Sequence, residues 1–196
     1  MPKTGLTQEQ LRDRAIEHTI DRMRRFGYEK VRLSDIARDL GITHAALYSH
    51  FADKAALFDA VSERWLKNVD SQLEDVCNDK EISALQRISK WFLVLHRAKK
   101  EKVQCDPELF RAFNMSAMLE KDFVRRHLEL MDVHLHTLVQ SAIDEGSIKG
   151  NVDEIVKIIR TATIEFHHPL MVLERINENQ EQLLQQILSA IYAGLK

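Results

Sequence analysis

The chain has 196 residues, 44% hydrophobic and 30% charged, which is typical of a globular protein with one or two cores. Six Gly and three Pro are few for the tight turns of a sheet-rich fold, so the composition favours long helices with short connections. The net charge of −2 does not indicate a nucleic-acid partner, and since we find neither a signal-peptide core nor a membrane-length apolar run, we expect a cytoplasmic protein with no membrane partner.

The N-terminal segment predicts a longer helix followed by two short ones. Thr7 begins a capping box, and apolar residues then recur at helical spacing until Gly27, where the first helix should end. Gly41 separates two short helices expected over about 34–40 and 45–50. This arrangement predicts a tri-helical helix-turn-helix, a DNA-binding motif, although any three-helix bundle has similar spacing.

A long fourth helix is expected after Asp53, which can cap it. Residues 1–55 carry ten Lys/Arg and eight Asp/Glu, hence +2, whereas the remaining residues carry eighteen and twenty-two, hence −4. The basic excess is small but compatible with a DNA-binding N-terminal part. We therefore expect a helix-turn-helix domain over residues 1–53 and a larger helical domain over residues 54–196.

Helical spacing of apolar residues continues to the C-terminus. Further helices are expected at about 82–99, from Pro107 onward, at 117–145, from 151 or 153 onward, and at 179–195. Pro169 should kink or end the helix that precedes it, because proline lacks the N–H that a helix interior needs. The expected fold class is all-α, with an N-terminal tri-helical helix-turn-helix and a larger helical domain.

Residues 26–57 read FGYEKVRLSDIARDLGITHAALYSHFADKAAL. This segment resembles the DNA-binding domain of the TetR family of repressors. The matching positions are Phe26-Gly27-Tyr28, Ile36-Ala37, Gly41-Ile42-Thr43, Leu47-Tyr48, His50-Phe51, Lys54 and Leu57. The sequence departs from the family pattern at Ala45, where glycine is frequent, and at Arg32, where a small hydroxyl residue is frequent. The rest of the chain resembles the family only in helical character and length.

The resemblance implies that residues 43–50 enter the major groove of operator double-stranded DNA. Thr43 would cap this recognition helix, and phosphate contacts would come from both flanks. The DNA-binding residues expected are Arg32, Ser34, Thr43, His44, Ala45, Ala46, Tyr48, Ser49, His50 and Lys54.

In this arrangement His44, Ala45 and Ala46 face base edges, and the other residues contact the DNA backbone. For Tyr48 and His50, packing at the edge of the core is the alternative role. The recognition helix contains no Arg or Lys, so the strongest guanine contact is absent. DNA shape and backbone contacts should therefore carry more of the specificity.

The middle helices concentrate aromatic residues, methionines and a few polar groups, as small-molecule pockets do. Together with the resemblance, this predicts a site for a small-molecule effector. The residues expected to line it are Trp91, Phe92, His96, Phe110, Phe113, Asn114, Met118, Phe123, His127 and Met131. The alternative is that the same residues form an ordinary core.

The last two helices lie where the TetR family forms its dimer interface, so the resemblance implies a homodimer, which also suits a two-fold operator. The interface residues expected are Leu184, Ile187, Leu188, Ile191 and Tyr192. The alternative is burial of these residues against the helix at 117–145.

The function indicated is a transcriptional repressor that a small-molecule ligand releases from its operator. The alternative is a metal- or redox-responsive regulator that uses the histidines of the larger domain with Cys77 or Cys105. The spacing of His127 and His134, seven apart, does not suit a metal pair on one helix, and we expect no metal site and no cofactor. We find no nucleophile–base set, phosphate loop or paired carboxylates, so we do not expect an enzyme.

Overall fold

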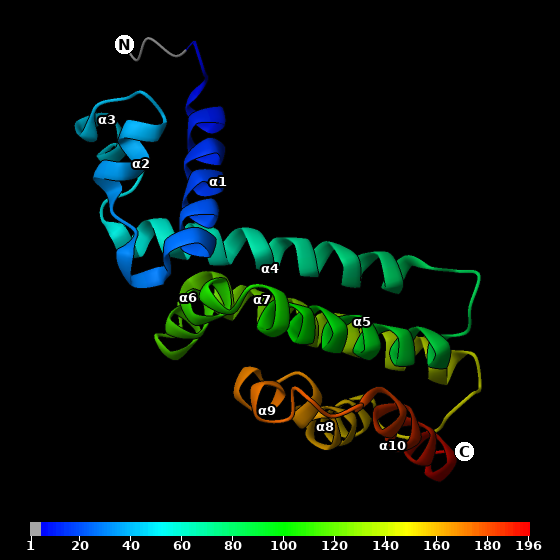
Figure 1. Cartoon of the computed structure of the whole chain (residues 1–196). Helices are drawn as coiled ribbons and strands as arrows, with labels where there is room; N and C mark the ends of the chain where they lie inside the picture. Colours follow the sequence, from blue (N-terminus) through cyan, green and yellow to red (C-terminus); the bar gives the residue numbers. More distant parts are fainter. Residues whose placement is uncertain (1–4) are drawn as a thin grey trace. The chain divides into compact units, whose positions relative to one another are not determined.

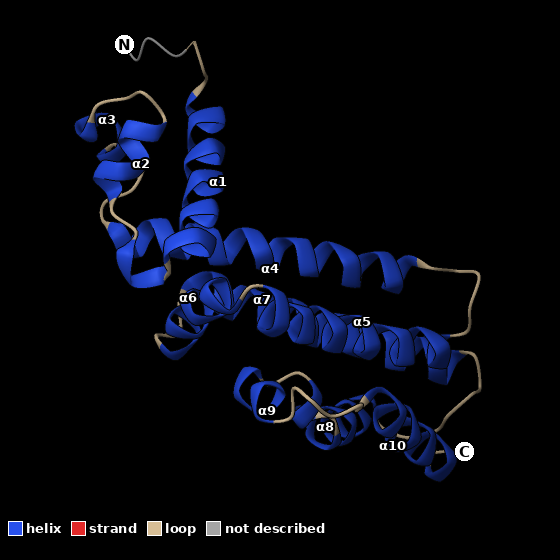
Figure 2. Cartoon of the chain, in the orientation of Figure 1, coloured by secondary structure: helices blue, strands red, loops and turns tan. Residues whose placement is uncertain are grey.

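A computed structural model describes residues 5–196, and over these residues it contains helices and loops but no strand (Figure 2). The all-α fold expected from the sequence is confirmed. The helices are α1 (Gln8–Phe26), η1 (Tyr28–Lys30), α2 (Leu33–Asp39), α3 (His44–Tyr48), α4 (Lys54–Asn78), α5 (Ala84–Cys105), α6 (Pro107–Met118), α7 (Asp122–Asp144), α8 (Val152–Ala162), η2 (Ile164–Phe166), α9 (Pro169–Glu174) and α10 (Glu181–Gly194).

The chain forms two compact units (Figure 1). Unit 1 comprises Met1–Leu66 and Asp106–Val124, and unit 2 comprises Lys67–Cys105 and Arg125–Lys196. Unit 1 thus contains α6 and the first half of α4 in addition to the three N-terminal helices. The functional division at residues 53 and 54 stays a prediction.

The predicted helix caps of unit 1 are present. The Thr7 hydroxyl accepts from the Gln10 backbone N–H at 3.2 Å, and the Gln10 side chain accepts from the Thr7 N–H at 2.9 Å, which completes the capping box. Gly27 ends α1 with a φ of +86°, a region that favours glycine. Asp53 accepts from the Ala56 N–H at 2.7 Å and so caps α4.

A single apolar core holds the helix-turn-helix together. α2 packs on both α1 and α3, and the residues at the centre are less than 2% exposed. These central residues are Ala15, Met23, Val31, Ile36, Leu47, Phe51 and Leu57. α6 closes the core from another side with Leu109 and Ala112, so unit 1 extends beyond the three N-terminal helices.

In unit 2, α5 is the central helix and packs on α9 and α10, while α10 also contacts α8. Its core is built from large side chains that are less than 2% exposed. These include Leu73, Ile88, Trp91, Phe92, Leu95, Leu138, Val139, Ile159, Phe166, Leu184 and Leu188.

Several helix boundaries differ from those expected, and three differences are large. α5 continues to Cys105, and the helix expected at 117–145 begins only at Asp122, because α6 first ends in a turn where Glu120 has a φ of +47°. The expectation for Pro169 was wrong. α8 already ends at Ala162, and Pro169 begins α9, since the first turn of a helix does not use its N–H.

Among the helices of residues 5–196, none is both long enough and apolar enough to cross a membrane.

Candidate nucleic-acid interface and effector site

The recognition helix α3 is held rigidly at its start and on its inner side. Gly41 has a φ of +65° in the turn before it, and the Thr43 hydroxyl accepts from the Ala46 N–H at 3.1 Å. The predicted Thr43 cap is therefore confirmed. Leu47 is fully buried beneath the helix, so the remaining side chains of α3 are turned away from the core.

The outer face of α3 presents His44, Ala45, Tyr48 and Ser49 to solvent. The ring of His44 meets the ring of Tyr48 edge-on, with centroids 4.7 Å apart. Tyr48 remains 45% exposed, so its ring is not part of the core. Ser49 donates its hydroxyl to the Ala46 carbonyl at 2.8 Å and keeps acceptor capacity for a partner.

His50 is half-buried, and its carbonyl accepts from the Arg12 guanidinium at 3.3 Å. The same guanidinium lies 4.8 Å from the centre of the Phe51 ring. The end of α3 is thereby fixed to α1.

The residues expected on the flanks of the DNA have different environments. Arg32 is the N-cap position of α2, and both Arg32 and Ser34 are exposed. Lys54 is half-buried and donates to the Glu29 carbonyl at 3.0 Å, and its ammonium lies 5.1 Å from the centre of the Phe58 ring. Only the donors that Lys54 does not use in this contact remain for a phosphate.

Sequence reasoning missed an ion pair that fixes α2 to α1. Arg22 donates to both carboxylate oxygens of Asp39, at 2.6 and 3.0 Å, and it lies 3.4 Å from Asp35. Hydrogen bonding from Arg22 lowers the pKa of Asp39. Because Arg22 and Asp39 are 17 positions apart, no local sequence pattern could reveal this contact.

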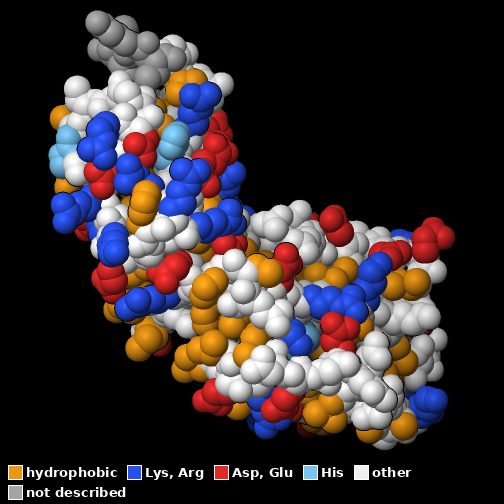
Figure 3. Space-filling view, viewed as in Figure 1, with side chains coloured by type: hydrophobic (Ala, Val, Ile, Leu, Met, Phe, Trp, Pro, Cys, Tyr) orange, Lys and Arg blue, Asp and Glu red, His pale blue; other side chains and the backbone are white. Residues whose placement is uncertain are grey.

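Figure 3 shows Lys and Arg side chains mixed with acidic ones on the surface of unit 1.

The residues expected to bind an effector divide between the two units. Phe110, Phe113, Asn114, Met118 and Phe123 belong to unit 1, and the other five belong to unit 2. Phe113 packs edge-on against the Trp65 ring at 4.8 Å, whereas Met118 is 78% exposed.

The five residues in unit 2 are Trp91, Phe92, His96, His127 and Met131, and all are buried. His127 of α7 pairs through its Nδ1 with the Asp70 carboxylate of α4 at 2.5 Å. His96 of α5 pairs through its Nδ1 with the Phe166 carbonyl at 2.7 Å.

Unit 2 also buries ionisable groups, and two of them, Lys99 and His167, were not among the residues expected at the effector site. Lys99 of α5 is 4% exposed, and desolvation lowers the pKa of its ammonium to about 7. Desolvation likewise lowers the pKa of His167 to about 3 and lowers that of His127. Within residues 5–196, the buried Nε2 atoms of His96, His127 and His167 have no hydrogen-bond partner.

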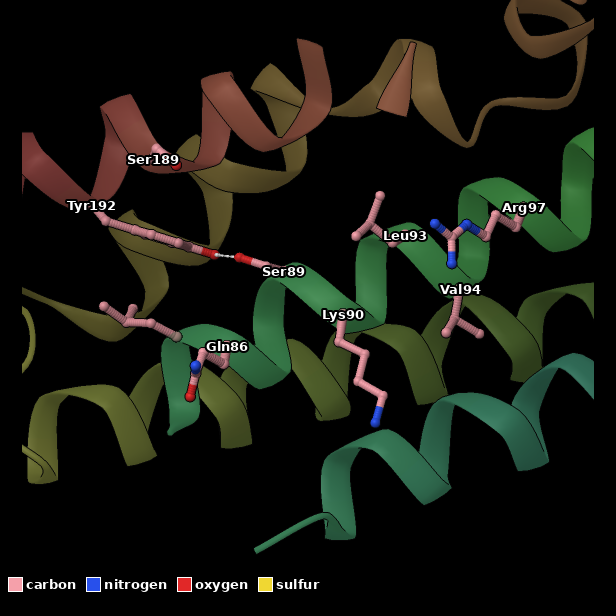
Figure 4. Close-up of a pocket in the computed structure, with 9 residues that line it drawn as sticks. Gln86, Ser89, Lys90, Leu93, Val94, Arg97, Ser189 and Tyr192 are labelled. Atoms are coloured by element: carbon pink, nitrogen blue, oxygen red, sulfur yellow. Dashed lines mark hydrogen bonds between the residues drawn. The ribbon is translucent and has the colours of Figure 1, made fainter. Parts of the chain in front are cut away.

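A separate surface hollow of about 480 Å³ lies along α5 and α10 (Figure 4). Two of the side chains that line it, Ser89 and Tyr192, form a 3.2 Å hydrogen bond between their hydroxyls. The cationic side chains that line it are already in ion pairs, Lys90 with Asp79 and Arg97 with Glu181. None of the ten residues expected to bind an effector lines this hollow.

The residues expected at a dimer interface have two different environments. Leu184 and Leu188 are fully buried and Tyr192 is 9% exposed, so these three belong to the core of their own unit and offer almost no surface to a partner. They lie on α10, and this helix packs mainly against α5 and α8, not against α7. Ile187 and Ile191 are half-buried and remain accessible.

The metal and redox alternative finds no support in the geometry. Over the described part of the chain, no group of three or more His, Cys, Asp and Glu is arranged to hold a metal ion. Cys77 and Cys105 are both free thiols, and burial raises the pKa of Cys77 to about 11, which disfavours the reactive thiolate.

Two family models match the chain. Residues 16–61 match the model of bacterial regulatory proteins of the tetR family, and residues 84–188 match the tetracyclin repressor-like C-terminal domain. The nucleoid occlusion factor SlmA of Shewanella frigidimarina is 25% identical over 133 residues. That alignment covers 65% of this chain and 65% of that protein, which is less than two thirds of its length.

Solved structures share the fold at low identity. A protein of unknown function from Rhodococcus sp. RHA1 is similar with a TM-score of 0.69 and 21% identity, covering 100% of this chain and 98% of that one. SmeT, the repressor of the Stenotrophomonas maltophilia multidrug efflux pump SmeDEF, is similar with a TM-score of 0.65 and 16% identity. It covers 98% of this chain and 91% of its own.

Proposed function

Because this chain belongs to the TetR family of bacterial regulatory proteins, we propose that it is a homodimeric repressor that a small-molecule effector releases from operator DNA. The observation that carries the proposal is the capped recognition helix α3, whose outer side chains are exposed while Leu47 anchors it. SmeT, which has a similar fold, is a repressor. Such a regulator would act in the cytoplasm, where the chromosome lies.

The proposed DNA contacts divide by chemistry. His44, Ala45 and Ala46 would meet base edges, because they lie at the start of α3, which enters the major groove in proteins of this kind. The hydroxyls of Tyr48 and Ser49 and the ring of His50 would contact the DNA backbone. The proposed set also includes Thr43, Lys54, and Arg32 and Ser34 at the start of α2. Phosphate contacts fix the register of the protein on the DNA.

The dimer surface is proposed on the outer faces of α8 and α10. On α10, Leu183 is 40% exposed, and Ile187 and Ile191 follow at helical spacing on the accessible side. On α8, Ile158 is 48% exposed. Apolar side chains grouped on the outside of two neighbouring helices are typical of a protein interface.

Effector control is proposed to reach the DNA through α4. This helix begins in unit 1, where Asp53 caps it, and carries Asp70 in unit 2, where that carboxylate binds His127. An effector that binds one conformation of unit 2 more tightly would favour the corresponding position of α4. Residues 1–53 would then bind DNA, and residues 54–196 would bind the effector and the second protomer.

The test is selection of DNA by the purified full-length protein from a random pool, followed by light scattering of the complex. We expect an enriched two-fold symmetric sequence bound by a protein dimer. Recovery of unrelated sequences, or a protein that stays at the 22.8 kDa of one chain, would contradict the proposal.

A further inference from the structure

The recognition helix has no positive side chain of its own. The sequence from Gly41 to Asp53, which contains α3, has neither Lys nor Arg. Lys54 follows directly, but it is half-buried and already donates to the Glu29 carbonyl at 3.0 Å. Proteins gain much of their affinity for DNA from cations that contact phosphates, because each such contact releases condensed counterions. A DNA interface built around α3 therefore needs a cation from another element of unit 1.

Arg12 of α1 is distinguished from many other arginines of unit 1 by its partners. Several of those arginines are in ion pairs with carboxylates, namely Arg22, Arg24, Arg38, Arg64 and Arg111. Within residues 5–196, Arg12 forms no ion pair with a carboxylate. Its Nη1 donates instead to the backbone carbonyl of His50 at 3.3 Å. A neutral carbonyl leaves the positive charge of the guanidinium uncompensated.

The guanidinium of Arg12 is held beside the end of α3. It lies 4.8 Å from the centre of the Phe51 ring, and arginine stacks well on aromatic faces. The bond to His50 uses one of its five N–H donors. Arg12 is half-buried, so part of the side chain remains accessible. The group is thus fixed in position, charged, and able to donate further hydrogen bonds.

This position borders the residues proposed to contact the DNA backbone. The carbonyl that Arg12 binds belongs to His50, which directly follows Tyr48 and Ser49. Figure 1 shows that α3 and the first turns of α1 lie at the same end of unit 1. The planar fork of a guanidinium matches the oxygens of a phosphate, and such charge-assisted bonds are stronger than neutral ones.

We infer that Arg12 donates to a DNA phosphate beside Tyr48, Ser49 and His50 while its bond to the His50 carbonyl holds the end of α3. The inference rests on the proposed function, to which it adds a contact from α1 and names its chemistry. One side chain then joins the DNA backbone to the recognition helix. Because stacking on Phe51 already orders the guanidinium, little conformational freedom is lost when the phosphate binds.

The test is fluorescence anisotropy of the full-length protein with two duplexes, one carrying the selected sequence and one of mixed sequence, over about 50 to 200 mM salt. Arg12→Gln removes the charge and keeps an amide N–H that can donate to the His50 carbonyl. We expect affinity to fall about tenfold or more, and the slope of log affinity against log salt to shrink by about one per protomer. Both duplexes should show the smaller slope, since a phosphate contact does not depend on sequence.

Two variants separate this contact from a purely positioning role. Arg14→Gln removes the same charge from an exposed position two residues further along α1, on a different side of the helix, and should leave the slope nearly unchanged. Arg12→Lys keeps the charge and should keep the wild-type slope. A positioning role alone predicts weaker binding by Arg12→Gln with the wild-type slope.

The inference would be overturned by a wild-type slope in Arg12→Gln, an equal loss of slope in Arg14→Gln, or the same loss in Arg12→Lys. A crystal structure of the wild-type protein with the selected duplex is a second measurement that needs no variant to fold. We expect a phosphate oxygen within hydrogen-bond distance of the Arg12 guanidinium, and its absence there would also overturn the inference.

The mixed-sequence duplex separates failure of this inference from failure of the proposed function. Preference for the selected duplex, combined with an unchanged slope in Arg12→Gln, would contradict this inference alone. Equal binding of both duplexes, with the smaller slope in Arg12→Gln, would contradict the proposed function alone. Absence of binding to either duplex would contradict both.

Discussion

Unit 1 and unit 2 differ in where they place ionisable side chains. In unit 1 the ionisable side chains lie at the surface and are paired there, as Arg22 and Asp39 are, around a core of apolar residues. In unit 2, Lys99 and His127 are themselves buried, and desolvation is the largest cause of the shifts in their pKa values. The first arrangement, an apolar core with ion pairs at its surface, suits a domain that holds its DNA-binding helix in a fixed position. The second removes ionisable groups from water, and this desolvation shifts their pKa values.

The largest effect should follow from damage to the core of unit 1. Leu47→Ala removes a fully buried side chain beneath α3 and should lower the free energy of unfolding by about 2–5 kcal/mol. Loss of this anchor should also abolish specific DNA binding. Urea denaturation measures the first effect, and Ala45→Ser, on the exposed face, is the control. A loss below about 1 kcal/mol would show that α3 does not depend on this core.

A pH-dependent effect on stability is expected for Lys99→Met. Burial lowers the pKa of Lys99 from its ordinary 10.5 to about 7 in the folded chain, so between these pH values only the unfolded state keeps the proton. Wild-type stability should therefore rise with pH across that window. Lys99→Met should lose this rise in stability between about pH 7 and pH 10.5, because methionine does not titrate.

Urea denaturation at several pH values checks this prediction, with Lys100→Met as the control. A Lys99→Met protein whose stability rises with pH as much as that of the wild type would mean that Lys99 is not the group that titrates in this window. The contrast between the two units would then be wrong.

These two positions show what the sequence could and could not reveal. Leu47 and the caps at Thr7, Thr43 and Asp53 were predictable, because a cap or an amphipathic stripe is a local pattern. The environment of Lys99 was not, since a lysine in a helix is normally solvated, and Asp70 and His127 come from two other helices.

The C-terminal helix shows a second limit of sequence reasoning. Its apolar stripe was recognised, but a stripe does not reveal what covers it. Leu184 and Leu188 are covered by their own unit, whereas the large apolar side chains of Leu183, Ile187 and Ile191 on α10 remain accessible.

A smaller and more selective effect is expected for His44→Ala. If His44 reads a base, preference at one position of each half-site should relax by roughly 1–3 kcal/mol. Folding should change little, because His44 is exposed and its ring meets the Tyr48 ring edge-on. Binding to a set of single-base operator variants measures this. A uniform loss on all sequences would make His44 a backbone contact instead.

The smallest effect is expected for Lys54→Ala. If Lys54 contacts phosphate, the slope of log affinity against log salt should shrink by about one per protomer, without a change in sequence preference. Its contact with the Glu29 carbonyl leaves donors for this role. Lys80→Ala, at an exposed position, is the control. An unchanged slope would remove Lys54 from the proposed interface.

The most direct test of the account is fluorescence anisotropy of labelled DNA, comparing a sequence selected by the protein with a scrambled one at the same salt concentration. If the outer face of α3 reads an operator, the selected DNA should bind at least about a thousandfold more tightly than the scrambled DNA. The complex should contain two protomers. Equal affinity for both DNAs would contradict the claim that this chain is an operator-binding regulator.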